Sequence, residues 1–201
     1  MPRLGVIRPR KLRFMTRATD RETPPLTPER LERAALRYLE RFAASVASLR
    51  RVLVARVDRS AAVHGTDRAQ GVAWVDALLV RYQASGLLDD GVYAEAKAAS
   101  LRRRGLSGRA IRERLAVRGV VAETAKAALA RTDLDRDGDT DESADETAAR
   151  ALARRRRLGP FRPPEQRALH RTRDLAILGR AGFAYETARR VIDAQDDDGP
   201  G

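Results

Sequence analysis

Two short patterns recur in this sequence at almost the same spacing, and this internal repetition constrains the fold more than any other feature. The pattern S-x-x-x-[LI]-R-x-x-L begins at Ser45 and again at Ser107, which is an offset of 62. An eight-residue segment that begins at Gly119 matches one that begins at Gly182, which is an offset of 63. Two independent matches at nearly one period predict tandem repeats of about 60 residues.

Each predicted repeat reads as three helices. Thr27 is a typical N-cap, and apolar residues follow it at three- and four-residue spacing as far as Phe42. Ser45 and Ser107 can cap later helices, and Gly86 is typical of a helix end. No stretch alternates apolar and polar residues over a strand length, so we predict no strands. Units this small bury little surface alone, so the predicted fold class is all-α, an elongated array of three tandem three-helix repeats.

The same patterns divide the chain into six segments. In chain order we expect a flexible basic arm (1–25), a first repeat (26–86), a second repeat (87–132), an acidic linker (133–144), a third repeat (145–195) and a disordered tail (196–201). The arm is charged, is interrupted by prolines and shows no helical or strand period. Ordered structure is therefore expected in the three repeats.

The charge balance favours an anionic partner. The formal net charge is +12 and the pI is about 11.1, which suits nucleic acid, an acidic protein surface or anionic lipid. However, 37 of the 40 basic residues are arginine in a chain rich in alanine and valine, a bias that GC-rich coding also produces. Aromatic residues make up only 4% of the chain, which argues against a base-stacking oligonucleotide-barrel or RRM domain.

Several classes of protein are disfavoured by missing residue types. The chain has no cysteine, so we expect no disulfide, thiolate zinc site or cysteine nucleophile, and a reducing cytoplasm is the natural compartment. No apolar run is long enough for a secretory signal or a transmembrane helix, so no membrane association is expected. The two histidines, His64 and His170, belong to no triad or zinc motif, and no phosphate-binding loop is present. We therefore expect no enzymatic activity and no cofactor.

An acidic stretch between the second and third repeats resembles a calcium loop. Counted from Asp133, carboxylates or glycine stand where an EF-hand loop has its early ligands and its central glycine. Position twelve, which needs a bidentate glutamate, is Ala144. The interpretation we favour is an acidic linker whose last carboxylates lie at a helix N-terminus, and we predict no metal site.

Arginine clusters are the candidate contacts with a partner. Three arginines end one predicted helix, two more lie on the solvent side of the next helix, and four follow one another in the third repeat. Each cluster either binds a polyanion or acidic partner through paired hydrogen bonds, or forms a solvated face and a helix C-cap. The candidate contact residues are Arg102, Arg103, Arg104, Arg109, Arg112, Arg154, Arg155, Arg156 and Arg157.

The segment GLLDDGVYAEAKAASLRRRGLSGRAIRERLAVRGV, residues 86–120, resembles the central repeat of the RecX regulatory proteins. The resemblance lies in the leucine-aspartate-aspartate turn, the pair Tyr93 and Ala94, and the isoleucine-containing helix that ends at Arg118 and Gly119. It extends more weakly from about residue 26 to residue 192. The tandem three-helix repeats of that family agree with the repeats found by self-comparison.

This resemblance also implies a function. It implies a small cytoplasmic bacterial protein, expected as a monomer, that binds the RecA recombinase filament along its deep groove. Such a protein restrains recombination and strand exchange, and so acts in DNA repair and the SOS response. Because the net charge is positive, we also expect single- and double-stranded DNA as ligands. The alternative is a stand-alone DNA-binding protein of the helix-turn-helix or nucleoid type, because short units with arginine-rich helices also suit DNA grooves.

Overall fold

The computed structural model describes residues 24–134 and 143–194, and within these ranges the chain forms nine α-helices, one short 3-10 helix and no strand. This confirms the predicted all-α class. Nearly all of the predicted arm, most of the acidic linker and the predicted tail lie outside the described residues. The segment boundaries given above stay a prediction.

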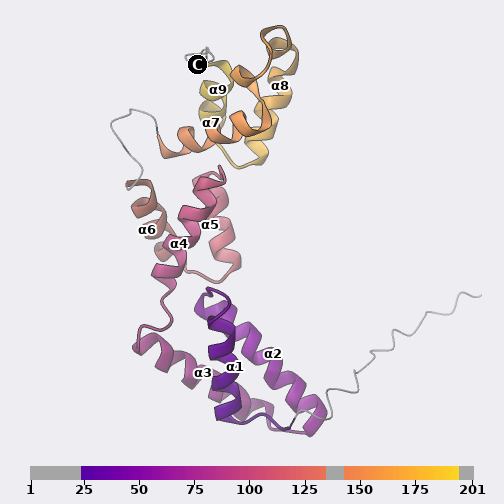
Figure 1. Ribbon diagram of the computed structural model, residues 1–201, viewed down its shortest axis with the longest axis vertical. Coiled ribbons are helices and arrows are strands. Elements are labelled where there is room, and N and C mark those ends of the chain that lie inside the picture. Colours follow the sequence, from indigo (N-terminus) through magenta and orange to yellow (C-terminus); the bar gives the residue numbers. More distant parts are fainter. Residues whose placement is uncertain (1–23, 135–142, 195–201) are drawn as a thin grey trace, which may run out of the picture.

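The helices follow one another in three groups of three along a curved, elongated molecule (Figure 1). The first group contains α1 (Pro28–Leu39), α2 (Val46–His64) and α3 (Arg68–Ala84). The second contains α4 (Asp90–Arg103), α5 (Gly108–Val117) and α6 (Ala122–Leu134). The third contains α7 (Ala144–Arg156), the 3-10 helix η2 (Gly159–Phe161), α8 (Pro164–Arg180) and α9 (Tyr185–Asp193). The starts of α2 and α5 reproduce the first sequence offset, and the starts of α6 and α9 reproduce the second.

Local signals in the sequence set the helix ends. Thr27 caps α1 by accepting a hydrogen bond from the Arg30 amide, and Ser45 caps α2 in the same way. Asp89 accepts two backbone amides at the start of α4. Gly86, with φ of +74°, occupies the left-handed conformation just after α3. The contacts of Thr27 and Ser45 and the conformation of Gly86 confirm the predicted helix signals.

Each group of helices encloses its own hydrophobic core. Leu31, Leu49, Leu53 and Val75 are fully buried in the first core. The second core contains ten buried residues around Ile111 and Leu115, and the third contains ten around Leu178 and Val191. The three cores are separate, so each repeat is held together mainly by its own side chains, and contacts between repeats are confined to the junctions.

The second helices of the three repeats meet end to end. At the first junction, the Ser45 hydroxyl at the start of α2 donates to the carbonyl of Arg118 at the end of α5, at 2.5 Å. At the second junction, the Ser107 hydroxyl at the start of α5 donates to the carbonyl of Ala181 at the end of α8, at 3.0 Å. In both cases the positive end of one helix dipole faces the negative end of another. The array therefore has a line of helices running through all three repeats.

An aspartate from the neighbouring repeat completes each junction. Asp90 of α4 accepts the Val46 amide at 2.8 Å, and Asp145 of α7 accepts the Gly108 amide at 2.9 Å. Each junction also contains a glycine with positive φ, Gly119 or Gly182, where a Cβ atom would clash with the facing helix. The same close contact is thus built twice from equivalent residues.

The third repeat contains a buried carboxylate that stabilises the PFRPP segment. Asp174 of α8 is fully buried and accepts hydrogen bonds from Arg162 through Nε at 2.7 Å and Nη2 at 2.9 Å. It also accepts the Gly159 amide at 2.9 Å. Burial alone would raise the pKa of Asp174, but the hydrogen bonds from Arg162 and Gly159 lower it below its ordinary value. Asp174 therefore carries a charge inside the third repeat, and that charge positions the turn before α8.

Candidate basic interaction surface

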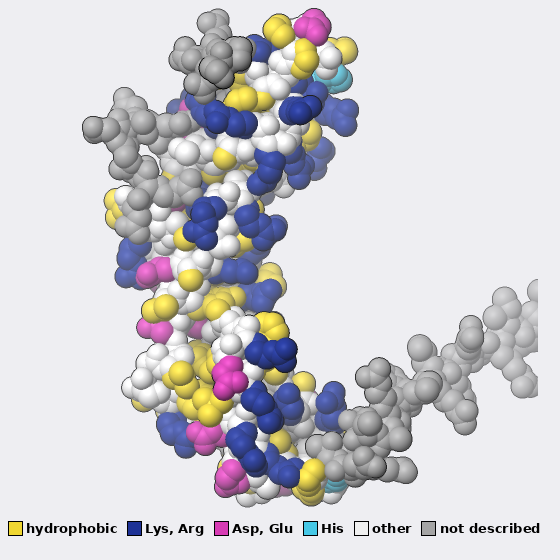
Figure 2. Space-filling model, viewed as in Figure 1, with side chains coloured by type: hydrophobic (Ala, Val, Ile, Leu, Met, Phe, Trp, Pro, Cys, Tyr) yellow, Lys and Arg dark blue, Asp and Glu magenta, His cyan; other side chains and the backbone are white. Residues whose placement is uncertain are grey.

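Arginine and lysine side chains gather along the inner edge of the curved molecule, from the first repeat to the third (Figure 2). None of the helices in the described ranges combines the length and the apolar character that a membrane span requires. The curvature brings the basic side chains of successive repeats to one side of the array. Such an edge can lie against an extended anionic partner through charge-assisted hydrogen bonds.

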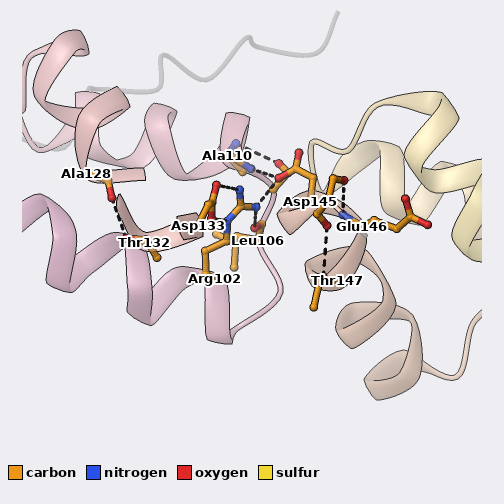
Figure 3. A network of polar contacts seen from close by, with 12 residues as sticks. Arg102, Leu106, Ala110, Ala128, Thr132, Asp133, Asp145, Glu146 and Thr147 are labelled. Atoms are coloured by element: carbon orange, nitrogen blue, oxygen red, sulfur yellow. Dashed lines mark hydrogen bonds and ion pairs between the residues drawn. The ribbon is translucent and has the colours of Figure 1, made fainter. Parts of the chain in front are cut away.

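Arg102, one of the predicted contact residues, lies inside the protein. Its side chain is 3% exposed. Its Nε and Nη2 donate to the two carboxylate oxygens of Asp133 at 2.9 Å and 2.8 Å, and its Nη1 donates to the Leu106 carbonyl and to Asp145 (Figure 3). The structure therefore contradicts the prediction that Arg102 contacts a partner, because all of its charge is used within the chain.

The Arg102 network joins the second repeat to the third. Arg102 lies near the end of α4, Asp133 near the end of α6 and Asp145 in the first turn of α7 (Figure 3). Burial alone would lower the pKa of Arg102, but hydrogen bonds to Asp133 and Asp145 raise it above its ordinary value. Asp145 also accepts the Gly108 amide, so one carboxylate holds both the guanidinium and the start of α5. This role could not be read from the sequence because nothing local to Arg102 distinguishes it from its neighbours.

The network also bears on the acidic stretch. Residues 135–142, which contain most of the calcium-like pattern, lie outside the described residues. Asp133, the first residue of that pattern, is paired with Arg102. Asp145 and Glu146 lie in the first turn of α7 behind the cap Ser143, as predicted for carboxylates at a helix N-terminus. Among the described residues, no group of three or more His, Asp or Glu side chains is arranged to hold a metal ion.

The other predicted residues of the second repeat are on the surface. Arg103 and Arg104 end α4, and Arg109 and Arg112 lie on α5; all four are exposed. Arg109 lies 3.5 Å from Glu113, an i,i+4 pair in which both side chains are mostly exposed and which contributes little stability. These four guanidinium groups are available to a partner.

The predicted arginines of the third repeat are exposed as well, and one of them contacts the second repeat. Arg155 donates to the Arg104 carbonyl at 2.8 Å, which brings the clusters at the ends of α4 and α7 together. The Arg154 guanidinium lies 5.4 Å from the ring centroid of Phe161. Arg156 and Arg157 end α7 at the surface. Two of the predicted clusters thus form one basic region across the junction of the second and third repeats.

A further basic site in the first repeat was not predicted. Three hollows of about 190, 270 and 430 Å³ follow one another along α1 and the residues that precede it, and Arg56 of α2 lines all three. We call them together the α1–α2 groove. The arginines that line it are Arg30, Arg33, Arg37, Arg41, Arg56 and Arg59. A signal was present in the sequence, because arginines at 30, 33, 37 and 41 recur at three- and four-residue spacing and so share one helix face.

Comparison with known proteins identifies the family. Residues 89–129 match the family model described as RecX, second three-helix domain. The chain is 46% identical over 170 residues to Regulatory protein RecX of Myxococcus xanthus, which covers 84% of this chain and 87% of that protein. It is 34% identical over 105 residues to Regulatory protein RecX of Agrobacterium fabrum, covering 52% of this chain and 51% of the relative. No solved structure gives a significant match.

The fold and the basic edge define a class of protein, an all-helical array of tandem three-helix repeats with a positively charged inner surface. The sequence identity to the Myxococcus xanthus relative, and the share of both chains that the match covers, show which family within that class is present. The chain belongs to the RecX family of regulatory proteins.

Proposed function

We propose that this protein binds the RecA nucleoprotein filament and restrains its recombinase activity. Family membership supports a regulatory role, since the relatives are named regulatory proteins. The segment that carries the resemblance, residues 86–120, forms α4 and α5 in the middle repeat. A partner that lies along the array would meet this repeat together with its neighbours on both sides.

The observation that carries the proposal is the repeated junction. Ser45 and Ser107 hold successive repeats through equivalent hydrogen bonds, and the facing glycines allow the same close approach at both positions. A filament is itself a series of identical subunits, so an array with a fixed step between its basic repeats can contact several subunits at once. Linked weak contacts of this kind strengthen one another through a high effective concentration.

The mechanism we propose is steric and electrostatic. Guanidinium groups bind phosphates or carboxylates in a bidentate manner, and the exposed arginines near the junction of the second and third repeats provide such groups. An array bound along the filament covers the surface that an incoming subunit or DNA strand needs. It thereby blocks extension of the filament or favours release of its subunits.

Neutralisation of the middle-repeat arginines tests this proposal. We expect the joint substitution of Arg103, Arg104, Arg109 and Arg112 by glutamine to raise by about tenfold or more the concentration that half-inhibits DNA-dependent ATP hydrolysis by RecA, because partner-facing charges are removed. The matched control replaces by glutamine four arginines that form ion pairs within the chain, Arg50, Arg68, Arg81 and Arg171. Both variants lose the same charge. Equal loss of inhibition in the two variants would contradict a specific role for the middle repeat.

A further inference from the structure

The α1–α2 groove carries positive charge that the rest of the first repeat does not neutralise. The ion pairs described in this repeat are Arg50–Asp76, Arg68–Asp58 and Arg81–Glu32, and each of them uses a residue of α3. Within the described residues, the side chains of Arg37, Arg41, Arg56 and Arg59 make no ion pair or hydrogen bond with the protein, and only their backbone groups do. Glu40 is the one acidic residue among those that line the three described hollows. A concentration of unpaired like charges in a concave site favours an anionic ligand.

The sequence that precedes the groove is also basic. Pro24 and Leu26 line two of the hollows, so the chain enters the folded region at the groove. The segment 1–23, which precedes Pro24, contains seven basic and two acidic side chains.

A pair of aromatic side chains lies in the part of the groove that Pro24 does not line. Tyr38 and Phe42 line the largest hollow together with Arg37, Arg41 and Arg56. The ring centroids of Tyr38 and Phe42 are 5.1 Å apart with an interplanar angle of 42°. The Phe42 side chain is 55% exposed, whereas Tyr38 is half-buried. The Phe42 ring is thus supported on one side by Tyr38 and open to solvent beside unpaired guanidinium groups.

We propose that the α1–α2 groove binds single-stranded nucleic acid. The groove arginines contact successive phosphates, and Phe42, supported by Tyr38, stacks on a base. Positively charged grooves combined with exposed aromatic rings are how proteins bind single strands without sequence preference. A duplex keeps its bases stacked on one another and has none to offer to Phe42, so the aromatic pair favours the single strand. One stacking pair suffices for this site, and no oligonucleotide-barrel or RRM domain is involved.

Two groups of variants separate the roles of charge and stacking. Binding of fluorescein-labelled dT20 and rU20 is measured by anisotropy at several salt concentrations, with the full chain and with no recombinase present. Substitution of Arg37, Arg41 and Arg56 by glutamine should weaken binding at least tenfold. It should also reduce the slope of the logarithm of the binding constant against the logarithm of the salt concentration by about 2, at about 0.7 for each phosphate that is no longer neutralised. The matched control is the substitution of Arg50, Arg68 and Arg81 by glutamine, which removes the same charge from the paired face and should change the dissociation constant less than about threefold.

Phe42→Ala should weaken binding by about fivefold to a hundredfold and leave the salt slope unchanged, because stacking releases no counterions. Phe42→Trp should restore binding, and Val80→Ala, at an exposed apolar residue of α3, should have no effect. Comparison of dT20 with rU20 shows which single strand is preferred.

Three results would overturn the proposal: no effect of Phe42→Ala, equal affinity for a duplex of the same length, or stronger binding of a poly-glutamate peptide than of dT20. The last result would assign the groove to an acidic protein segment. None of these outcomes depends on RecA, so the failure of this inference is distinguishable from the failure of the proposed function.

Discussion

Replacement of Asp174 by alanine is expected to lower the free energy of unfolding of the third repeat by about 3–5 kcal/mol, the range for breaking a buried ion pair from one side. Asp174 is fully buried, and the Arg162 side chain that it pairs with is only 18% exposed. Alanine would leave that guanidinium and the Gly159 amide without their acceptor. Hydrogen exchange measured by mass spectrometry should show reduced protection over α7, α8 and α9 and little change over α1 to α3, because each repeat contacts only its neighbours.

Asp193 provides the matched control in the same repeat. It pairs with Arg171 at 2.7 Å, but both side chains are about two-fifths exposed. Asp193→Ala should therefore cost less than about 1 kcal/mol. Equal destabilisation by the two variants, or reduced protection throughout the chain after Asp174→Ala, would contradict this description of the third repeat.

The charge on Asp174 also predicts a pH dependence. Its pKa is lowered in the folded protein, so its contribution to stability is present above the pKa of an unfolded aspartate, about 3.9, and is lost as the pH falls through the folded-state pKa. The difference in unfolding free energy between the wild type and Asp174→Asn should be constant from pH 5 to 8 and should shrink below about pH 4. Urea unfolding followed by circular dichroism measures it. A difference that stays constant down to pH 2 would show that the pKa of Asp174 is not lowered in the folded protein.

Replacement of Arg102 by methionine is also expected to lower the free energy of unfolding by a large amount. The methionine fills much of the same volume but leaves Asp133 and Asp145 without their shared guanidinium. These carboxylates are 23% and 34% exposed and can regain some hydration, so we expect a loss of about 3 kcal/mol, at the lower end of the range for broken buried pairs. Protection from hydrogen exchange should fall at the end of α6 and the start of α7.

The neighbouring residue offers the control for Arg102. Arg103 is exposed at the end of α4, and Arg103→Met should change the unfolding free energy by less than about 0.5 kcal/mol. If Arg102→Met cost no more than Arg103→Met, the network of Arg102, Asp133 and Asp145 would not hold the second junction together.

Much of the fold was predictable because its signals are local and repeated. The serines at 45 and 107 and the glycines at 119 and 182 define the offsets, and the structure shows why they recur: each pair forms the same contact between helix ends. The cap contacts of Thr27 and Asp89 involve residues only two or three positions apart. Such signals can be read from a short window of sequence.

The network of buried charges was not predictable for the opposite reason. Arg102 pairs with residues 31 and 43 positions away, and its neighbours Arg103 and Arg104 have the same side chain but are exposed. A run of arginines does not reveal which member turns inward. The α1–α2 groove likewise depends on the packing of two helices, although the spacing of the arginines on α1 could have indicated one of its walls.

The proposed regulation of RecA is tested most directly by a salt titration of the wild-type protein against RecA filaments and against bare DNA in parallel. We expect inhibition of DNA-dependent ATP hydrolysis at well below one molecule per RecA subunit, because an elongated array spans several subunits. We also expect inhibition to persist at salt concentrations that abolish binding to bare DNA, since phosphate contacts alone weaken steeply with salt. If inhibition instead requires concentrations that coat free DNA and disappears with DNA binding as salt rises, the protein competes for DNA and the filament-binding proposal is wrong.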